Sequence, residues 1–437
     1  MQEESFDLIV IGSGSGLDVA NAAASQNLKV AIIEKDMMGG TCLNRGCIPS
    51  KLLIHSANVA ETIRRANIFG INTDNFSVDF EKIVKRVNDI TDAGSDTIRK
   101  SYQNSDNPKL FLKECKFIGE KKIAFTDGET TTTITAEKIL IASGTIPRIP
   151  EIKGLKESGS ITSDEALRLK QQPRVLTFIG GGYISCELAH FYGSLGTEIN
   201  IIQLGDTLIP NEDEEVSQRF TEVFSKRYNV YLGYRTETIT KKKRNHKVDD
   251  SSETFHVTAK NDTSERKIEL ESDQLLVAVG RVPNSYSLDL QRTGVKVNEK
   301  GFVIVDEYLE TSVKGIFAIG DVVGHFQFKH NANHEAQYVY HNILNSDSKI
   351  SVDYTAMPHA IFSSPQVAGV GFTEQQLKMQ DKIDYVKSVY PYIQTAMGKA
   401  IEDRNGFVKF LVNRNDKKIL GCHIIGTDAS TLIHTYS

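Results

Sequence analysis

Two cysteines, Cys42 and Cys47, lie in the segment Gly-Gly-Thr-Cys-Leu-Asn-Arg-Gly-Cys-Ile-Pro-Ser-Lys, residues 39–51, and such a pair can act as a redox-active disulfide. An undistorted α-helix separates positions five apart by about 7.5 Å along its axis. That is too far for the usual disulfide Cα separation of roughly 4.4–6.8 Å. The segment between the cysteines must therefore bend or unwind. Gly46 and Pro49 suit a bend, because glycine tolerates unusual backbone angles and proline removes a helical donor.

These cysteines have two other interpretations, a structural zinc site and two unrelated buried cysteines. A zinc site would need a second pair of ligands at metal-binding spacing, and none lies near Cys115, Cys186 or Cys422. The sequence favours a redox pair over both, and we predict no metal site.

A glycine-rich turn precedes the cysteines and has the pattern of a dinucleotide-binding unit. The apolar run at residues 6–11 leads into Gly12, Gly14 and Gly16, a helical pattern follows, and a second apolar run ends before Glu34. Glycines permit a tight turn and close approach of the backbone to a pyrophosphate, whose charge is met by amides at the helix N-terminus. Glu34 lies near the roughly 20-residue spacing expected of an acid that binds ribose hydroxyls. Leucine replaces the usual third glycine, so an ordinary glycine turn is the alternative.

The same order of elements recurs at residues 174–203. A strand leads into a turn with Gly180, Gly182 and Ser185 at the fingerprint positions, and a helix and a second strand follow up to Gln203. Two nucleotide-binding units in one chain imply two dinucleotides.

The composition excludes several classes of protein. The chain has 437 residues, which suggests two to three domains, and its formal net charge of −5 argues against nucleic acid as a primary partner. Acids stand at the N-terminus where a secretory signal needs a basic start, and no apolar run reaches membrane-spanning length. Five cysteines with one meaningful spacing fit a reducing compartment. We therefore expect a cytoplasmic protein without nucleic-acid or membrane partners.

The segment 39–51 resembles the redox motif of the FAD-dependent disulfide reductases, the group of dihydrolipoamide dehydrogenase and of glutathione, mycothione and mercuric reductases. The resemblance runs from about Phe6 to the end of the chain. It implies FAD on the first unit, NAD or NADP on the second, a disulfide or dithiol substrate, and a homodimer formed through the C-terminal region. By analogy, Cys47 is the flavin-proximal thiolate and Cys42 exchanges with the substrate disulfide.

The resemblance also implies an ion pair near the flavin. Lys51 follows Cys47 by one helical turn, and Glu187 matches the family glutamate that pairs with this lysine. A cation there stabilises the reduced, anionic flavin and the adjacent thiolate.

Residues 315–322 look like the second FAD signature of the family. There the resemblance implies that Asp321 bonds the ribitol chain and that Gly320 lets the backbone pass close to the flavin phosphates. Residues 328–335 resemble the family helix that covers the flavin ring. The other cofactor-binding residues that we predict are Lys35, Gly40, Thr41, Ser143, Gly144, Gly280, Lys329 and His330.

The choice between NADH and NADPH is poorly marked. Gln203 stands where NAD-using family members carry an acid that accepts hydrogen bonds from both ribose hydroxyls. Residues 204–210 contain no Arg or Lys for a 2′-phosphate. The missing cations give a small preference for NADH.

Family members also carry a His-Pro segment followed by a glutamate near the C-terminus, which supplies an acid/base to the partner subunit's cysteines. This sequence stops at Ser437 before such a segment, and we assign its role to neither His423 nor His434. We expect a truncated dimerisation domain, and the alternative is a natural variant that works without this dyad.

The predicted fold is α/β, with two Rossmann-like nucleotide-binding domains and a C-terminal α+β dimerisation domain. The expected boundaries are 1–148 for the first part of the FAD-binding domain, 149–270 for the NAD(P)-binding domain, 271–346 for the second FAD-binding part and 347–437 for the dimerisation domain. Residues 275–280 are expected to return the chain to the first unit.

Dihydrolipoamide is the first substrate hypothesis, because it is the commonest partner of this motif. A mycothione reductase-like enzyme is the second, since residues 329–336 look more like that branch. A non-catalytic flavin-binding subunit is the alternative from another class, and the intact cysteine pair argues against it.

Overall fold

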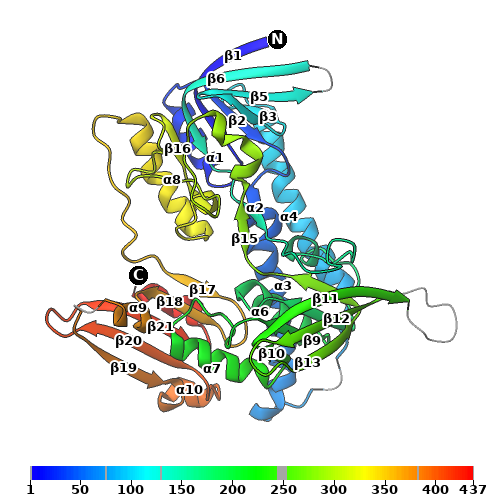
Figure 1. Ribbon diagram of the computed structural model, residues 1–437. Coiled ribbons are helices and arrows are strands. Elements are labelled where there is room, and N and C mark those ends of the chain that lie inside the picture. The colour runs from blue at the N-terminus through cyan, green and yellow to red at the C-terminus, as the bar shows by residue number, and fades with distance from the viewer. Residues whose placement is uncertain (1, 74–75, 128–129, 244–252, 381–382, 437) are drawn as a thin grey trace. The chain divides into compact units, whose positions relative to one another are not determined.

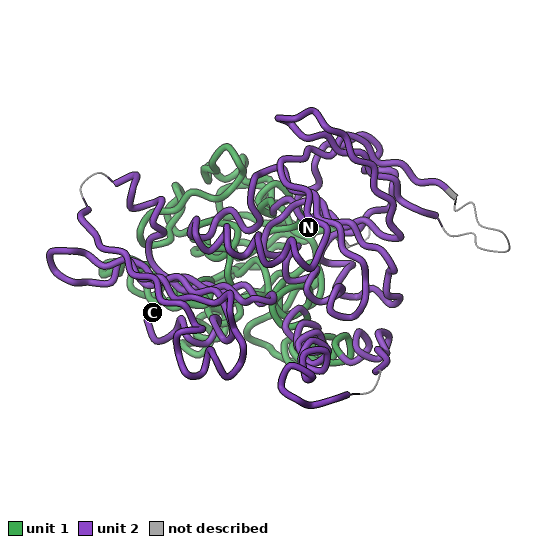
Figure 2. Tube along the Cα trace, turned by 90° about the horizontal axis from the view of Figure 1, so that it is seen from below, with its two compact units in different colours: residues 1–49, 87–147, 281–354 green, residues 50–86, 148–280, 355–437 purple. Residues whose placement is uncertain are grey.

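The structure is a computed structural model that describes residues 2–73, 76–127, 130–243, 253–380 and 383–436. The chain divides into two compact units, each made of three separate stretches (Figure 2). Unit 1 comprises Met1–Pro49, Val87–Pro147 and Arg281–Tyr354, and unit 2 comprises Ser50–Arg86, Arg148–Gly280 and Thr355–Ser437.

Unit 1 is built on one mainly parallel sheet (Figure 1). Its strands are β1 (Gln2–Ile11), β2 (Val30–Glu34), β3 (Lys109–Leu112), β4 (Lys116–Gly119), β5 (Lys122–Asp127), β6 (Thr130–Ile141) and β16 (Ile316–Ala318). In the same unit, β7 (Thr145–Pro147) and β15 (Arg281–Pro283) form a separate two-stranded antiparallel sheet. Its helices are α1 (Gly16–Ser25), α2 (Gly40–Arg45) and α8 (Lys329–Leu344) with the short turns η2 (Asn284–Leu288), η3 (Leu290–Arg292) and η4 (Gly320–Val322), while α3 (Cys47–Arg65) and α4 (Phe80–Gln103) cross its boundaries.

The sheet of unit 1 runs in the order β3-β2-β1-β6-β5-β4, and β16 also pairs with β6. Strand β1 lies between β2 and β6, parallel to both. Its alternate residues enter two cores, Leu8 and Val10 on the face covered by α1 and α8, and Ile9 and Ile11 on the other. A strand buried on both faces reads as a continuous apolar run, which explains the pattern at residues 6–11.

The described residues of unit 2 form three sheets. Its strands are β8 (Val175–Ile179), β9 (Glu198–Gln203), β10 (Asn229–Leu232), β11 (Tyr234–Lys243), β12 (Glu253–Asn261), β13 (Lys267–Ser272), β14 (Gln274–Val277), β17 (His359–Ile361), β18 (Val367–Gly371), β19 (Tyr385–Pro391), β20 (Phe407–Asn413) and β21 (Ile419–Ile425). Its helices are α5 (Ser163–Ala166), α6 (Tyr183–Ser194), α7 (Glu214–Ser225), α9 (Glu374–Lys378), α10 (Ala396–Ala400) and α11 (Ala429–Leu432), with the turns η1 (Ala66–Phe69), η5 (Tyr392–Gln394) and η6 (Ile433–Thr435).

The second nucleotide-type sheet is parallel and runs in the order β10-β9-β8-β14. The prediction that residues 275–280 return the chain to the first unit is wrong, because β14 pairs with β8 through Leu275↔Thr177 and its neighbours. The chain re-enters unit 1 at Arg281. A short apolar strand fits either buried sheet equally well, so its sequence alone does not choose between them.

The C-terminal part of unit 2 is an antiparallel sheet in the order β17-β18-β21-β20-β19. Residues Ala368, Val370, Cys422 and Ile424 form its core together with Ala429 of α11. The observed architecture is the predicted α/β fold with two parallel nucleotide-type sheets and a C-terminal α+β part.

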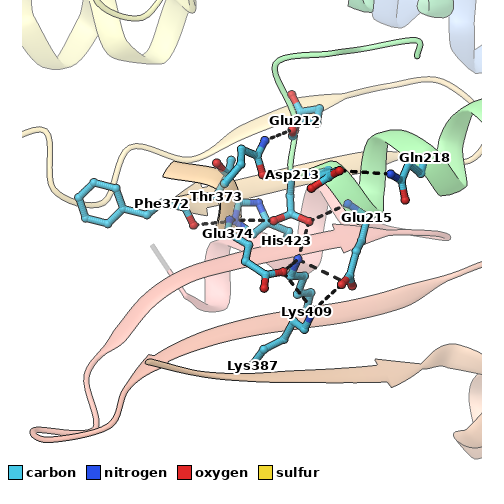
Figure 3. A network of polar contacts seen from close by, with 12 residues as sticks. Glu212, Asp213, Glu215, Gln218, Phe372, Thr373, Glu374, Lys387, Lys409 and His423 are labelled. Atoms are coloured by element: carbon cyan, nitrogen blue, oxygen red, sulfur yellow. Dashed lines mark hydrogen bonds and ion pairs between the residues drawn. The ribbon is translucent and has the colours of Figure 1, made fainter. Parts of the chain in front are cut away.

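A buried ion-pair network joins this C-terminal sheet to α7 (Figure 3). The ammonium of Lys409 on β20 is 0% exposed and lies 2.8 Å from Asp213 Oδ1 and 2.6 Å from Glu374 Oε2. Asp213 also caps both helices, since it accepts from the backbone N–H of Glu215 in α7 and of Glu374 in α9. Burial opposes ionisation of Glu374, but Lys409 and Lys387 lower its pKa to about 2.

Replacing Lys409 by methionine should destabilise unit 2 by about 3–5 kcal/mol, because the buried carboxylates of Asp213 and Glu374 would lose their counter-charge. Urea unfolding followed by circular dichroism measures the loss. Lys418→Met is the matched control, because Lys418 is 80% exposed and should change stability by no more than about 0.5 kcal/mol.

The free energy of unfolding that Lys409 contributes should depend on pH. Carboxylates whose pKa is lowered on folding give stability that is present above their unfolded pKa and is lost as the pH falls through the folded value. The difference between wild type and Lys409→Met should therefore shrink as the pH falls from about 4.3, the ordinary glutamate pKa, toward the folded value of about 2 for Glu374. If the difference in unfolding free energy between wild type and Lys409→Met stays constant over this range, Lys409 does not stabilise the ionised carboxylates.

Candidate active site

The helix that carries the two cysteines is broken between them. Helix α2 ends at Arg45, Gly46 adopts φ −145° and ψ −119°, and α3 begins at Cys47. A Cβ on Gly46 would lie 3.0 Å from the carbonyl oxygen of Thr41 and 3.4 Å from the Cα of Cys42, so glycine lets the backbone fold back against the first cysteine. The predicted bend is confirmed, and Pro49 lies in the first turn of α3, where its missing N–H breaks no helical bond.

The bend brings the two cysteine side chains within hydrogen-bond reach of each other. This hydrogen bond raises the pKa of Cys42, burial raises it further, and the nearby charge of Lys329 opposes both. All five cysteines of the chain lie within the described residues, and they are thiols. Because the two thiols interact, the first proton leaves the pair more easily than the second.

The first glycine turn is tied to the acid at the end of β2. Gly12 has φ +105°, and a Cβ there would lie 2.3 Å from the carbonyl oxygen of Ala142. Glu34 accepts hydrogen bonds from the backbone N–H and the hydroxyl of Ser13, at 2.9 and 2.7 Å, and from the N–H of Asp36. Glu34 thus lies at the turn, where its carboxylate has lone pairs left for ribose hydroxyls.

The other predicted residues near this turn have different surroundings. Gly14 has no atom within 4 Å of where a Cβ would lie, whereas a Cβ on Gly16 would lie 2.7 Å from Val10 and one on Gly40 would lie 2.8 Å from Gly14. Gly16 therefore takes over the close helix-to-strand packing of the usual third fingerprint glycine. Two of the predicted residues are exposed, Thr41 and Lys35, the latter 3.8 Å from Glu114.

Polar groups collect where β6 and β16 end. The hydroxyl of Ser143 is buried and has no hydrogen-bond partner, and Gly144 follows with φ +66°. Burial raises the pKa of Asp321, while the charge of Arg281 and a 3.1 Å hydrogen bond from Thr145 lower it. Gly320, immediately before Asp321, has φ +74°. An orphaned hydroxyl and a buried carboxylate with spare lone pairs are what a polar ligand would satisfy.

Helix α8 contributes a cation to the first glycine turn. Lys329 Nζ donates to the hydroxyl of Ser15 at 2.8 Å, and that hydroxyl donates to Asn333 at 2.9 Å. Ser15 directly precedes α1, so the cation lies at the helix N-terminus where a pyrophosphate would be met. The predicted His330 instead stacks on Phe328, with ring centroids 5.5 Å apart.

Sequence reasoning missed a buried carboxyl that holds the turn before Asp321. Glu335 of α8 is 0% exposed and accepts from the N–H of Gly320 at 2.5 Å, from Asn331 at 3.0 Å and from the hydroxyl of Tyr354 at 2.9 Å. Burial raises its pKa. The hydrogen-bond partners lie up to 19 positions from Glu335 in the sequence. An acid within a polar helix gives no local signal of this role.

Unit 2 contains the Lys51–Glu187 ion pair that the resemblance implied. Lys51 Nζ lies 2.9 and 3.0 Å from the two carboxylate oxygens of Glu187, which is 5% exposed. Glu187 also accepts from the backbone N–H of Phe362 at 2.9 Å, and the Lys51 ammonium lies 4.4 Å from the centre of that phenyl ring. Both residues sit on helices, Lys51 one turn into α3 and Glu187 in α6, so their separation is well defined.

The second glycine turn is held by the same kind of hydrogen bond as the first, from a backbone N–H to the side chain that ends the next strand. Gln203 at the end of β9 accepts from the N–H of Gly181 at 2.9 Å and donates to the carbonyl of Thr207 at 3.2 Å. Gly182 directly precedes α6 and has open space where a Cβ would lie, whereas Ser185 is fully buried inside that helix. Gly280, with φ +113°, is the last residue of the middle stretch of unit 2, and the chain enters unit 1 at Arg281. The turn is thus shaped like the first, but an amide replaces its acid.

Comparison with known proteins identifies the family. A family described as pyridine nucleotide-disulphide oxidoreductase matches residues 6–336, and the dimerisation domain of the same family matches residues 357–437. The chain is 35% identical to a mycothione reductase of Mycobacterium tuberculosis, over 98% of this chain and 91% of that one. It is also 35% identical to a dihydrolipoyl dehydrogenase of Chlamydia pneumoniae, over 98% and 89% of the two chains.

The fold agrees with a solved structure of the same kind. The HOCl-induced flavoprotein disulfide reductase RclA from Escherichia coli, solved as a Cu(II) complex, superposes with a TM-score of 0.84 at 26% identity, over 99% of this chain and 92% of that one. The chain therefore belongs to the pyridine nucleotide-disulphide oxidoreductases. The predicted family, its FAD and NAD(P)H cofactors and the C-terminal dimerisation domain are confirmed.

The residues of unit 1 fit FAD. The orphaned hydroxyl of Ser143, the buried carboxylate of Asp321 and the tied turn at Gly12 and Glu34 offer polar groups of the right kind. Among the residues that the structure describes, no cluster of three His, Cys, Asp or Glu side chains is arranged to hold a metal ion. None of the helices within those residues combines the length and the apolar character needed to cross a bilayer.

Gly46→Ala should keep the two cysteine sulfurs apart, because the new Cβ would lie 3.0 Å from the carbonyl oxygen of Thr41 and 3.4 Å from the Cα of Cys42, both of which are backbone atoms. Under a mild oxidant, the variant should form much less Cys42–Cys47 disulfide, measured by alkylation of free thiols and mass spectrometry. Gly119→Ala is the control, since its Cβ would meet its neighbour at an ordinary 3.6 Å. Equal disulfide formation in all three proteins would show that Gly46 does not position the pair.

Proposed function

We propose that this protein passes electrons between NAD(P)H and a disulfide substrate through a Cys42–Cys47 redox pair. The observation that carries the proposal is the helix break at Gly46, which brings two thiols five positions apart into hydrogen-bond contact. FAD, when bound, carries the electron pair between the nicotinamide and the cysteines. We propose a cytoplasmic homodimer, supported by the dimerisation domain at residues 357–437.

The cysteines exchange with the substrate in two steps that balance. Cys42 as thiolate attacks one sulfur of the substrate disulfide, that S–S bond breaks, and one substrate thiolate leaves. Cys47 gives the remaining proton of the pair to the substrate thiolate that has left. Cys47 as thiolate then attacks Cys42 Sγ, the mixed disulfide breaks, the second substrate thiolate leaves, and the Cys42–Cys47 disulfide forms. Oxidation of a dithiol substrate runs through the same steps in reverse. The pKa of Cys42 is raised, so the proton of the singly protonated pair passes from Cys42 to Cys47 before Cys42 attacks as thiolate.

The Lys51–Glu187 pair has a positioning role in this proposal. Glu187 holds the Lys51 ammonium through both carboxylate oxygens and is itself fixed by the Phe362 amide. Lys51 lies one turn after Cys47 on α3, so the same helix carries a nucleophile and a cation. We propose that the cation favours the anionic forms of the groups that exchange electrons.

Dihydrolipoamide is the proposed substrate, and NAD its proposed partner. A mycothione-type low-molecular-weight disulfide is the second candidate, supported by the resemblance of residues 329–336 to that branch and by the similarity to a mycothione reductase. Relatives of both kinds are equally similar to this chain. The absence of Lys or Arg from residues 204–210 supports NAD over NADP.

Steady-state assays with each substrate and nucleotide test this choice. We expect dihydrolipoamide with NAD⁺ to give the highest kcat/KM, and NADP⁺ to give a lower value because no cation meets its 2′-phosphate. Lipoamide, mycothione disulfide and glutathione disulfide are compared in the reductive direction. A higher kcat/KM for mycothione disulfide would replace the first candidate by the second, and no turnover with any disulfide would contradict the proposal as a whole.

The roles of the two sulfurs are separable by spectroscopy of the FAD-loaded enzyme. On partial reduction, a long-wavelength charge-transfer band is expected if Cys47 is the thiolate beside the flavin. Cys42→Ser should keep or strengthen this band, because it leaves Cys47 as the sole thiolate of the pair, and Cys47→Ser should abolish it. The opposite pattern would reverse the two assignments. Cys186→Ser is the control, because Cys186 is fully buried and plays no part in the exchange.

A further inference from the structure

The loop between β9 and α7, residues 204–213, packs against the second glycine turn. The backbone N–H of Ile209 donates to the carbonyl of Gly181 at 2.8 Å, and the N–H of Glu212 donates to the carbonyl of Ile209 at 3.1 Å. Ile209 has φ +44°, which is rare for a β-branched residue and persists only where the surroundings impose it. The loop therefore holds the glycine turn in a fixed position, and its own shape depends on what anchors it.

The far end of this loop is anchored on the C-terminal sheet. His359 on β17 lies 2.7 Å from a carboxylate oxygen of Glu212, and its side chain is 24% exposed while that of Glu212 is 9% exposed. Gln375 of α9 donates to the carbonyl of Glu212 at 2.8 Å. The neighbouring Asp213 is held by the buried Lys409 (Figure 3). Of these three anchors, the His359–Glu212 pair is the one that gains or loses charge near neutral pH.

Strand β17 also reaches the proposed electron-transfer site. Phe362 follows the strand directly, and its N–H donates to Glu187, the partner of Lys51. The first residue of β17, His359, contacts loop 204–213 through Glu212. Phe362, the residue after the strand, contacts Glu187 of the Lys51–Glu187 pair. The contact of Phe362 is made by its backbone N–H and that of His359 by its side chain, so a substitution of His359 leaves the hydrogen bond to Glu187 in place.

We propose that His359 and Glu212 are positioning residues for the nicotinamide nucleotide, holding loop 204–213 so that the Gly180–Gly182 turn is preorganised for binding. This inference rests on the proposed function, because it assigns the nicotinamide nucleotide to the second parallel sheet. Preorganisation lowers the ordering cost of binding, so loss of the anchor weakens affinity without removing a ligand contact. The effect appears in KM and in the dissociation constant of the nucleotide, while kcat stays nearly unchanged.

The pair gives nucleotide affinity a pH dependence of defined sign. Burial lowers the pKa of His359, but the charge and the hydrogen bond of Glu212 outweigh it and raise the pKa above its ordinary value. A raised pKa means that the charged anchor is fully present below the ordinary histidine pKa of about 6.5 and is lost as the pH rises through the folded value. The other titratable or charged groups on the packed elements are His423 of β21, Asp213 before α7, Lys409 of β20 and Glu374 of α9.

Calorimetric titration of the FAD-loaded protein with NAD⁺ across pH 5.5–8.5 tests the inference. His359→Gln should raise the dissociation constant about three- to tenfold at low pH, in the range seen for residues coupled to a site through intermediate contacts. Glu212→Gln should do the same, and the double variant should add little, because both remove one interaction. The matched control is His256→Gln, which removes another His–Glu pair of unit 2, His256 with Glu271 at 3.3 Å on β12 and β13.

The outcomes separate this inference from the proposed function. Weaker binding by both anchor variants at low pH, converging on wild type as the pH rises, with His256→Gln unchanged, supports the inference. Equal affinity in all proteins overturns it, even if the anchor variants melt at lower temperature, and leaves the proposed function standing. If wild type binds neither NAD⁺ nor NADP⁺, the proposed function fails and the inference fails with it.

Discussion

Cysteines five positions apart cannot approach each other on a continuous helix, and the proposed chemistry of this protein depends on the backbone at Gly46, which removes that constraint. The break ends α2, folds the chain against Cys42 and starts α3 at Cys47. A second consequence follows from the same geometry. Because α3 restarts at the second cysteine, Lys51 falls on the next turn of that helix, in a defined relation to Cys47.

The two glycine turns are held in place by the same kind of hydrogen bond. In each, the residue after the first glycine donates its N–H to the side chain that ends the next strand, Ser13 to Glu34 and Gly181 to Gln203. This hydrogen bond restricts the conformation of each turn in the protein without a bound ligand. The difference between carboxylate and amide leaves the first turn with an acid for ribose hydroxyls and the second with a neutral acceptor.

Local features of the fold and the site could be predicted from the sequence. The bend between the cysteines follows from helix geometry, and the parallel strands follow from apolar runs beside glycine turns. The ion pair of Lys51 with Glu187 came from the family resemblance, because 136 positions separate the two residues and no local pattern joins them.

Other features could not be predicted because they depend on contacts between distant segments. Strand β14 is too short to reveal which sheet it joins. Lys409 reads as an ordinary strand lysine, yet the fold buries it between acids that lie 196 and 35 positions away. His359 and Glu212 have no shared motif, and their contact exists because α7 packs on the C-terminal sheet.

The central claim is that the Cys42–Cys47 pair shares electrons with a bound FAD. An anaerobic reductive titration of the purified FAD-loaded protein tests it most directly, because it counts the electrons taken up for each flavin. We expect two electron pairs per FAD, one held by the flavin and one by the cysteines, and a single pair in the Cys42→Ser, Cys47→Ser double variant. Uptake of a single pair by the oxidised wild-type protein would contradict it.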